Sequence, residues 1–249
     1  MSYFKIIKLD ATPSTNNYLK NKYKSRDVKD GDLVWTKNQT SGRGQRENNW
    51  FSKPVESLTF SIFKQYKDEN ISNPFIISIL VSLGIHEALS TINLPNLKIK
   101  WPNDILSCNK KIGGILIENT FKNNKLTNSI LGFGLNVNQS DFSKFPHAAS
   151  LFSLTKKKWN IEKVFEALIY ALEQDEFTNL VKHRDANLET FNSYLWRKGK
   201  PSKFQGVQSV FEAIPLEVTK QGGLVITSLE NEQKKELALA NARILYTQN

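Results

Sequence analysis

Short apolar runs recur along the first half of the chain at intervals typical of a β-rich domain. Runs that are apolar, β-branched or alternating predict strands over Asp32–Thr40, Ser57–Phe63, Leu97–Asp104, Lys110–Phe121 and Asn128–Asn138. The last two are separated by the polar sequence KNNK, which is typical of a hairpin turn. The pattern therefore predicts several strands that are close together in the chain and can pair with one another.

Three segments follow the helical period instead. A short helix is predicted over Ser14–Tyr23, capped by Ser14 or Thr15. The most apolar segment, residues 73–92, predicts a core helix, because it is too short and too polar to span a bilayer. The third helix is predicted over residues 160–182, where apolar residues recur on one face. We therefore expect no membrane association.

After about Tyr194 the pattern changes to short apolar runs divided by proline, glycine and polar turns. Such a pattern predicts a small all-β barrel of roughly 50 residues. The sequence thus predicts an α+β fold in two parts, residues 1–194 and residues 195–249.

The charge balance and the single cysteine narrow the class of protein. Lysine and arginine number 34 against 24 acidic residues, a formal charge of +10, which favours an anionic partner such as nucleic acid, a nucleotide or an acidic protein. Cys108 is the only cysteine, so no internal disulfide can form, and a reducing compartment is favoured. The N-terminal residues do not have the pattern of a signal peptide, so we expect a cytoplasmic protein.

The loop SGRGQRENNW, residues 41–50, combines backbone freedom with positive charge. Gly42 and Gly44 allow close approach of a ligand to the backbone, and Arg43 and Arg46 carry donors that match phosphate geometry. The loop is not a dinucleotide-binding GxGxxG sequence, because Glu47 stands where the third glycine would be. Taken alone, a basic surface loop without chemistry is an equally good interpretation.

Two further sequence clusters favour a binding site over a plain surface loop. The sequence KWPND places Lys100, Asn103 and Asp104 at the end of a predicted strand, and Lys110 and Lys111 begin the next one. A lysine directed at a phosphate can stabilise charge in phosphoryl or nucleotidyl transfer, and an Asn–Asp pair can orient a polar ligand or hold a metal ion. The third cluster, GFGLNVNQ, contributes Gly132, Gly134, Asn136 and Asn138. A solvated turn and packing glycines remain the plain alternatives.

Taken in order, STNNYL, QTSGRGQRENNW, KWPND, KKIGGILIE, GFGLNVN and AASLFSLT resemble the biotin protein ligases, and the resemblance covers essentially the whole chain. It implies a catalytic domain like that of class II aminoacyl-tRNA synthetases, with a mixed or antiparallel sheet, over residues 1–194. It also implies an SH3-like β-barrel over residues 195–249.

The resemblance also implies a two-step reaction. Biotin and ATP, the latter with Mg²⁺, form biotinyl-5′-AMP and pyrophosphate, and biotin then passes to one lysine of a biotin carboxyl carrier protein domain with release of AMP. Fewer than 15 residues precede STNNYL, so no N-terminal DNA-binding domain and no specific DNA binding are expected. Whether two copies form a homodimer stays open.

Matching residues carry the roles that the resemblance implies. The catalytic candidates are Lys111, between the biotin carboxylate and the α-phosphate, Arg46, facing the phosphates, and Asp104. The ligand-binding candidates are Ser14, Thr15, Asn16 and Gln39 for the biotin ring, Gly42, Arg43 and Gly44 for its tail, Trp50 and Asn136 for the adenosine, and Lys100, Asn103, Gly113 and Gly114. No metal ligand is assigned.

Two positions depart from the family pattern. Gln45 stands where many relatives have arginine, and Glu47 stands where they have glycine. Because Gln45 cannot neutralise a phosphate, we expect weaker retention of the adenylate.

Two rival functions are weighed beside the ligase. A lipoyl or octanoyl transferase shares the fold, and a basic nucleic-acid-binding protein would use the C-terminal barrel as its reader.

Overall fold

A seven-stranded mixed sheet forms the centre of the molecule in the computed structural model, which describes residues 2–46, 48–66, 71, 73–173 and 184–246. The sheet order is β1 (Lys5–Thr12), β2 (Asp32–Gln39), β5 (Ser57–Gln65), β9 (Lys125–Asn136), β8 (Lys110–Lys122), β7 (Asp104–Ser107) and β6 (Leu97–Lys100). Only β1 and β2 pair in parallel, and the other neighbours are antiparallel. The predicted α+β fold with a mixed sheet is confirmed.

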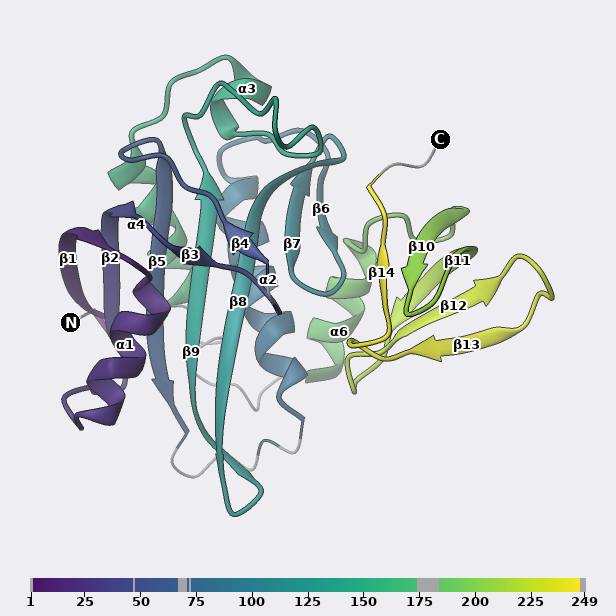
Figure 1. Cartoon of the computed structure of the whole chain (residues 1–249), viewed down its shortest axis with the longest axis horizontal. Coiled ribbons are helices and arrows are strands. Elements are labelled where there is room, and N and C mark those ends of the chain that lie inside the picture. Colours follow the sequence, from purple (N-terminus) through teal and green to yellow (C-terminus); the bar gives the residue numbers. More distant parts are fainter. Residues whose placement is uncertain (1, 47, 67–70, 72, 174–183, 247–249) are drawn as a thin grey trace.

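One face of the sheet carries the main hydrophobic core. Along β9, Leu131, Phe133 and Leu135 point into this core, because successive strand side chains alternate between faces. Helices α2 (Phe75–Ser90) and α4 (Ile161–Leu172) cover this face and lie behind the sheet in Figure 1. Helix α4 ends at Leu172, and residues 174–182 of the predicted third helix lie outside the described residues.

The opposite face is only partly covered. Helix α1 (Thr15–Lys24), capped by the Ser14 side chain, packs there, and a short ribbon of β3 (Gly42–Arg43) and β4 (Asn49–Trp50) crosses in front of the sheet in Figure 1. On this face β9 presents Gly132 and Gly134. A side chain at either position would collide with a neighbour, since a Cβ would lie 2.1 Å from Asn16 or 2.2 Å from Trp50.

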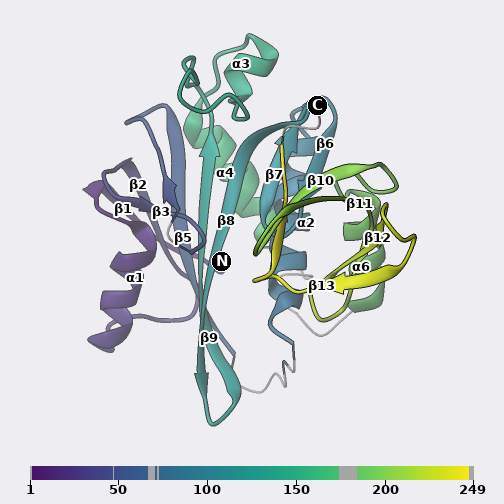
Figure 2. The same ribbon diagram turned by 45° about the vertical axis from the view of Figure 1, so that its right-hand side comes forward.

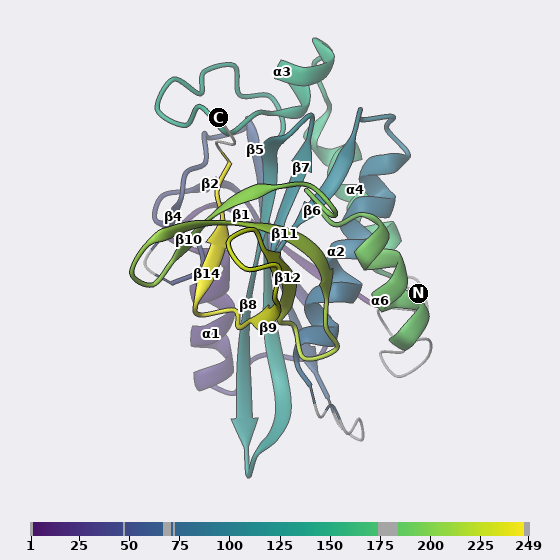
Figure 3. The same ribbon diagram turned by 90° about the vertical axis from the view of Figure 1, so that its right-hand side faces the viewer.

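The C-terminal strands form a separate five-stranded antiparallel sheet, compatible with the predicted small β domain. Its order is β13 (Lys234–Leu237), β12 (Leu224–Ser228), β11 (Val210–Val218), β10 (Ser202–Gly206) and β14 (Ala242–Ile244). Figures 2 and 3 show it beside the β6–β7 edge of the large sheet. The Trp101 indole donates to the Gly222 carbonyl at 2.9 Å, and Asn192 exchanges two hydrogen bonds with the Val218 backbone.

The junction between the two sheets lies among residues that still belong to the main core. Leu195 forms a bridge with Ile99 of β6, and the Trp196 amide donates to the Ile99 carbonyl at 2.8 Å. The first strand of the C-terminal sheet begins at Ser202. The division at residue 195 stays a prediction.

Some elements were not foreseen in the pattern. Strand β1 was missed because it is an edge strand whose side chains are mostly exposed, so it lacks an apolar run. Helix α6 (Arg184–Ser193) and the short α3 (Leu151–Thr155) were missed as well. Within the described ranges, none of the helices has the length and apolar character to cross a membrane.

Candidate active site

A cavity of about 900 Å³ opens on the partly covered face of the large sheet. Its walls come from the start of α1, the β3–β4 ribbon, the ends of β6 to β9 and the segment around β14. Most of the predicted site residues line it, namely Ser14, Thr15, Asn16, Gln39, Arg43, Gly44, Arg46, Trp50, Lys100, Asn103, Asp104, Lys111 and Gly114. The fold thus brings together clusters that are far apart in the sequence.

Three predicted residues lie outside the cavity wall. Gly42 packs beneath the Trp50 backbone, and Gly113 faces Leu135 in the core. The Asn136 amide donates to the Ala149 carbonyl at 3.0 Å and accepts from Gln139, so it fixes the chain after β9. These contacts are structural, and the ligand contacts that the sequence predicts for the three residues stay predictions.

One wall of the cavity is lined by Thr15, Asn16 and Gln39, and Ser61 supports them from the buried side; we call these four uncharged residues the neutral wall. The Asn16 amide also donates to the Glu118 carboxylate at 3.0 Å. The Gln39 side-chain oxygen accepts from the Thr15 backbone amide at 2.9 Å and from its hydroxyl at 3.2 Å. The Ser61 hydroxyl lies 2.7 Å from the Thr15 hydroxyl and 2.6 Å from the Asn16 amide oxygen. All four side chains are buried, so their positions are fixed before any ligand binds.

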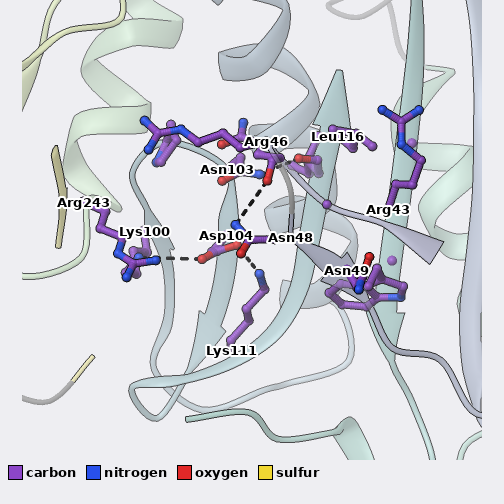
Figure 4. Close-up of a pocket in the computed structure, with 18 of the residues that line it drawn as sticks. Arg43, Arg46, Asn48, Asn49, Lys100, Asn103, Asp104, Lys111, Leu116 and Arg243 are labelled. Carbon is purple, nitrogen blue, oxygen red and sulfur yellow. Dashed lines mark hydrogen bonds and ion pairs between the residues drawn. The ribbon is translucent and has the colours of Figure 1, made fainter. Parts of the chain in front are cut away.

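The other wall is built around one buried carboxylate, and we define it, the charged wall, as Lys100, Asp104, Lys111 and Tyr246. Figure 4 shows Lys100 and Lys111 directed at Asp104. The Lys111 ammonium is 2.6 Å from one Asp104 oxygen. The second oxygen lies 3.7 Å from the Lys100 ammonium and accepts a 2.5 Å hydrogen bond from the Tyr246 hydroxyl. Lys100 and Asp104 face each other because they pair directly across β6 and β7.

Burial and charge act against each other in this cluster. Burial raises the pKa of Asp104, but the charges of Lys111 and Lys100 and the hydrogen bonds from Lys111 and Tyr246 outweigh it, so its pKa lies below the usual range. Burial lowers the pKa of Lys100, an effect that Asp104 only partly offsets. Burial, then Asp104, raises the pKa of the Tyr246 hydroxyl, so that hydroxyl remains a donor at neutral pH.

The two loop arginines have separate anchors. Arg43 donates to the Asn17 side chain at 2.9 Å and pairs with Glu118 at 3.3 Å, which holds it apart from the charged wall in Figure 4. Arg46 donates to the Leu239 carbonyl of the C-terminal part at 2.9 Å. Glu47 lies outside the described residues, so its effect on the loop stays a prediction.

Trp50 lies against the floor of the cavity. Its ring covers Gly134 and Gly114, and the Lys111 ammonium is 5.6 Å from the ring centre. The indole N–H is buried and has no acceptor among the described residues. A buried donor without a partner carries a free-energy cost, which a ligand with an acceptor atom would remove.

Several residues that line the cavity were not predicted from the sequence. His147 comes from the loop after β9, which is tied to β8 because the Lys111 amide donates to the His147 carbonyl at 2.7 Å. Arg243 and Tyr246 come from the C-terminal part, where the apolar pattern indicated only barrel strands. Nothing in the local sequence around these residues marks them as site residues.

The described residues offer no ready-made metal cage. They contain no group of three His, Cys, Asp or Glu side chains placed to hold an ion. Asp104 is the only carboxylate among the described cavity residues, and it is already paired, while the Asn103 amide donates to the Ile115 carbonyl at 2.6 Å. The metal ligands therefore stay unassigned.

The remaining metal-type side chains that the sequence offered are ordinary. His86 stacks on Tyr194 in the core, and Cys108 lies in the two-residue turn between β7 and β8. His183 is outside the described residues.

Together the fold and the cavity define an α+β protein with a ligand site whose two walls suit a polar, uncharged group and an anionic group. The profile of the Biotin/lipoate A/B protein ligase family matches residues 9–136, about half of the chain. The chain therefore belongs to this family.

The relatives agree with this assignment. The bifunctional ligase/repressor BirA of Escherichia coli is 30% identical over 129 residues, which are 52% of this chain and 39% of that protein. The biotin–[acetyl-CoA-carboxylase] ligase of Mycobacterium tuberculosis is 27% identical over 75% of this chain and 68% of its own length. The chain thus spans about two fifths of the Escherichia coli relative.

A solved structure extends the likeness to the whole fold. The biotin protein ligase of Aquifex aeolicus, in complex with biotin and ATP, has a TM-score of 0.77 and 26% identity, and the match covers 97% of this chain and 99% of that one.

Proposed function

We propose that this protein is an ATP-dependent biotin–protein ligase that forms biotinyl-5′-AMP and then transfers biotin to a lysine of a carrier domain. The observation that carries the proposal is the Lys111 ammonium, which Asp104 holds in the charged wall of a cavity whose opposite wall is neutral. The family membership and the Aquifex aeolicus structure with biotin and ATP support the choice of substrates.

The neutral wall suits the ureido head of biotin, which is polar but uncharged. Hydroxyl and amide groups of Ser14, Thr15 and Gln39 line this end, and such groups can pair with a ureido N–H or C=O. Hydrogen bonds between Thr15 and Gln39 fix these two side chains, and the Ser14 hydroxyl is held by the Asn17 amide, so little ordering is needed when the ligand enters.

The charged wall suits the reacting anions. The biotin carboxylate must attack the α-phosphorus of ATP, and the two groups repel each other strongly in a site with little water. The Lys111 side chain is 30% exposed and lines the cavity, so its ammonium can approach the reacting oxygens and stabilise the charge of the transition state. Arg46 provides a second cation, and the unpaired Trp50 N–H provides a neutral donor.

Mg²⁺ belongs to this reaction as part of MgATP. Because Mg²⁺ commonly binds through substrate phosphates with few protein carboxylates, the lack of a cage among the described residues fits this mode of entry. When bound with ATP, the ion would neutralise phosphate charge, and no protein ligand is assigned to it.

In the second step the carrier lysine attacks the mixed anhydride and AMP leaves. The anhydride hydrolyses in water, so the loop between β3 and β4 has to exclude solvent until the carrier arrives. The net charge of +10 favours an acidic carrier domain. The single cysteine is compatible with the cytoplasmic location that we propose.

Transfer of biotin to a carrier domain tests the proposal directly. The protein is incubated with MgATP, a recombinant biotin carrier domain and either biotin or lipoate, and the product is detected by streptavidin blotting or by mass. We expect transfer of biotin only, and its loss in Lys111→Ala but not in the neighbouring Lys110→Ala. Transfer of lipoate alone would establish the rival transferase, and transfer of neither acid would refute the ligase.

A further inference from the structure

A tyrosine from the extreme C-terminal part reaches the buried carboxylate of the charged wall. Tyr246 follows β14, and its hydroxyl donates to Asp104 at 2.5 Å although the two residues are 142 positions apart. Asp104 therefore uses one oxygen for Lys111 and the other for Tyr246 and Lys100. Each carboxylate oxygen thus has at least one partner that fixes its direction.

The ring of Tyr246 is held from several sides. His147 stacks on it with ring centres 5.4 Å apart and planes 8° apart, and Trp196 lies at 5.9 Å. The Lys100 ammonium lies 4.4 Å from the ring centre. Because the ring is fixed by groups from the loop after β9, the domain junction and β6, its hydroxyl has a defined position.

We propose that Tyr246 is a positioning residue for the ligase reaction: by fixing Asp104 it aims Lys111 at the reacting carboxylate and phosphate. This inference rests on the proposed function. It also gives the C-terminal part a defined task, since that part completes the charged wall and does not only cover the cavity.

The geometry explains why a hydroxyl is needed at this place. Without its donor, one Asp104 oxygen would be buried beside Lys100 alone, and the carboxylate could rotate about its bond to the Cβ. Rotation would move the oxygen that holds Lys111, and errors of about 1 Å in a reacting group can cost about 100-fold in rate. The hydroxyl thus acts on Lys111 through Asp104.

A kinetic test separates this role from simple packing. Tyr246→Phe keeps the ring and its stacking but removes the hydroxyl. We expect kcat for biotin-dependent pyrophosphate release to fall about tenfold, with KM for biotin within about twofold, because the neutral wall is untouched. Tyr23→Phe, on α1 and outside the cavity wall, is the matched control and should keep the wild-type kcat.

A second readout does not depend on activity. Lys111, Lys100 and Tyr246 face Asp104, with Arg243 acting on Lys100 and His147 on the tyrosine ring. The hydroxyl favours the ionised carboxylate, so the loss of stability in Tyr246→Phe, measured by urea unfolding at decreasing pH, should be largest at neutral pH. It should shrink as the pH falls through the folded pKa of Asp104, which lies below its usual range.

The kinetic and the unfolding experiments distinguish a failure of the positioning role from a failure of the proposed function. An unchanged kcat in Tyr246→Phe, or a loss of stability that does not shrink as the pH falls through the folded pKa of Asp104, would overturn the positioning role. If the wild-type protein forms no biotinyl-AMP, the proposed function falls, and the unfolding experiment alone then decides whether Tyr246 controls the Asp104 carboxylate.

Discussion

The two walls of the cavity are built on different physical principles. The neutral wall consists of buried groups that already satisfy one another, such as the Thr15 amide and the Gln39 oxygen at 2.9 Å. The charged wall places three donors around a single carboxylate, Asp104. A neutral network can select a ligand by shape and hydrogen bonding at little electrostatic cost, whereas buried charges carry a desolvation cost that their pairing has to offset.

The origin of the walls in the chain differs as well. The neutral wall uses α1, the end of β2 and one residue of the adjoining strand β5, all within the first 65 residues. The charged wall needs β6, β7, β8 and the C-terminal part. We therefore expect the neutral wall to govern biotin affinity and the charged wall to govern chemistry and stability.

Removing the cation of the charged wall should give the largest effect. We expect Lys111→Gln to slow biotin-dependent pyrophosphate release by about two to three orders of magnitude, since one well-placed donor contributes that much to a charged transition state. Stopped-flow detection of pyrophosphate measures this rate. Lys110→Gln, on the exposed neighbour, serves as the control, and equal loss in both variants would contradict the assignment of Lys111.

Removing the carboxylate should cost stability. Asp104→Asn leaves the Lys100 ammonium buried without an anion, and we expect a loss of about 3 kcal/mol at pH 7 by urea unfolding. Burial lowers the pKa of Lys100 below its unfolded value, so the unfolded chain binds more protons and stability rises as the pH rises through the folded pKa. The cost should therefore shrink toward pH 10.

An exposed pair provides the comparison for this variant. Asp27, which pairs with Lys22 at 2.9 Å on the surface, can be changed to Asn with little effect. A loss in Asp104→Asn that is as small as in Asp27→Asn would show that the charged wall does not contribute to stability.

Removing a side chain from the neutral wall should change the KM for biotin and leave the KM for ATP nearly unchanged. We expect Gln39→Ala to raise KM for biotin about tenfold, equivalent to about 1.4 kcal/mol for a lost hydrogen-bond acceptor and its network. KM for ATP should stay within about twofold. Initial rates with each substrate varied in turn measure both values, and a parallel rise in both would mean that the two walls are not separate.

Adding charge to the loop should give the smallest change. Gln45 lines the cavity, and Gln45→Arg would add a charge-assisted donor for the phosphate. We expect biotinyl-AMP to be retained about fivefold longer, as followed by dialysis or stopped-flow release of the adenylate. Equal retention in the wild type and the variant would show that Gln45 does not control retention of the adenylate.

Many of the residues that line the cavity could be predicted from short sequence motifs, because these motifs lie on neighbouring strands of the sheet. The turn after Leu97–Lys100, the start of β8 and the glycines of β9 converge because β6, β7, β8 and β9 are adjacent in the sheet. Short antiparallel connections leave few other ways to pair such strands. Gly132 and Gly134 belong to the third sequence cluster, and the structure shows that Asn16 and Trp50 pack against them.

The sequence by itself thus predicted the α+β architecture, a helix cap at Ser14 or Thr15 and, through motifs that resemble a known family, thirteen residues that line the cavity, because each depends on local periodicity or on short motifs. Only the tertiary structure decided that Asn136 supports a backbone, that Ser61 joins the neutral wall and that Tyr246 completes the charged one. Contacts across 142 residues leave no periodic trace, since they are set by how two sheets pack together and not by the neighbours of either residue.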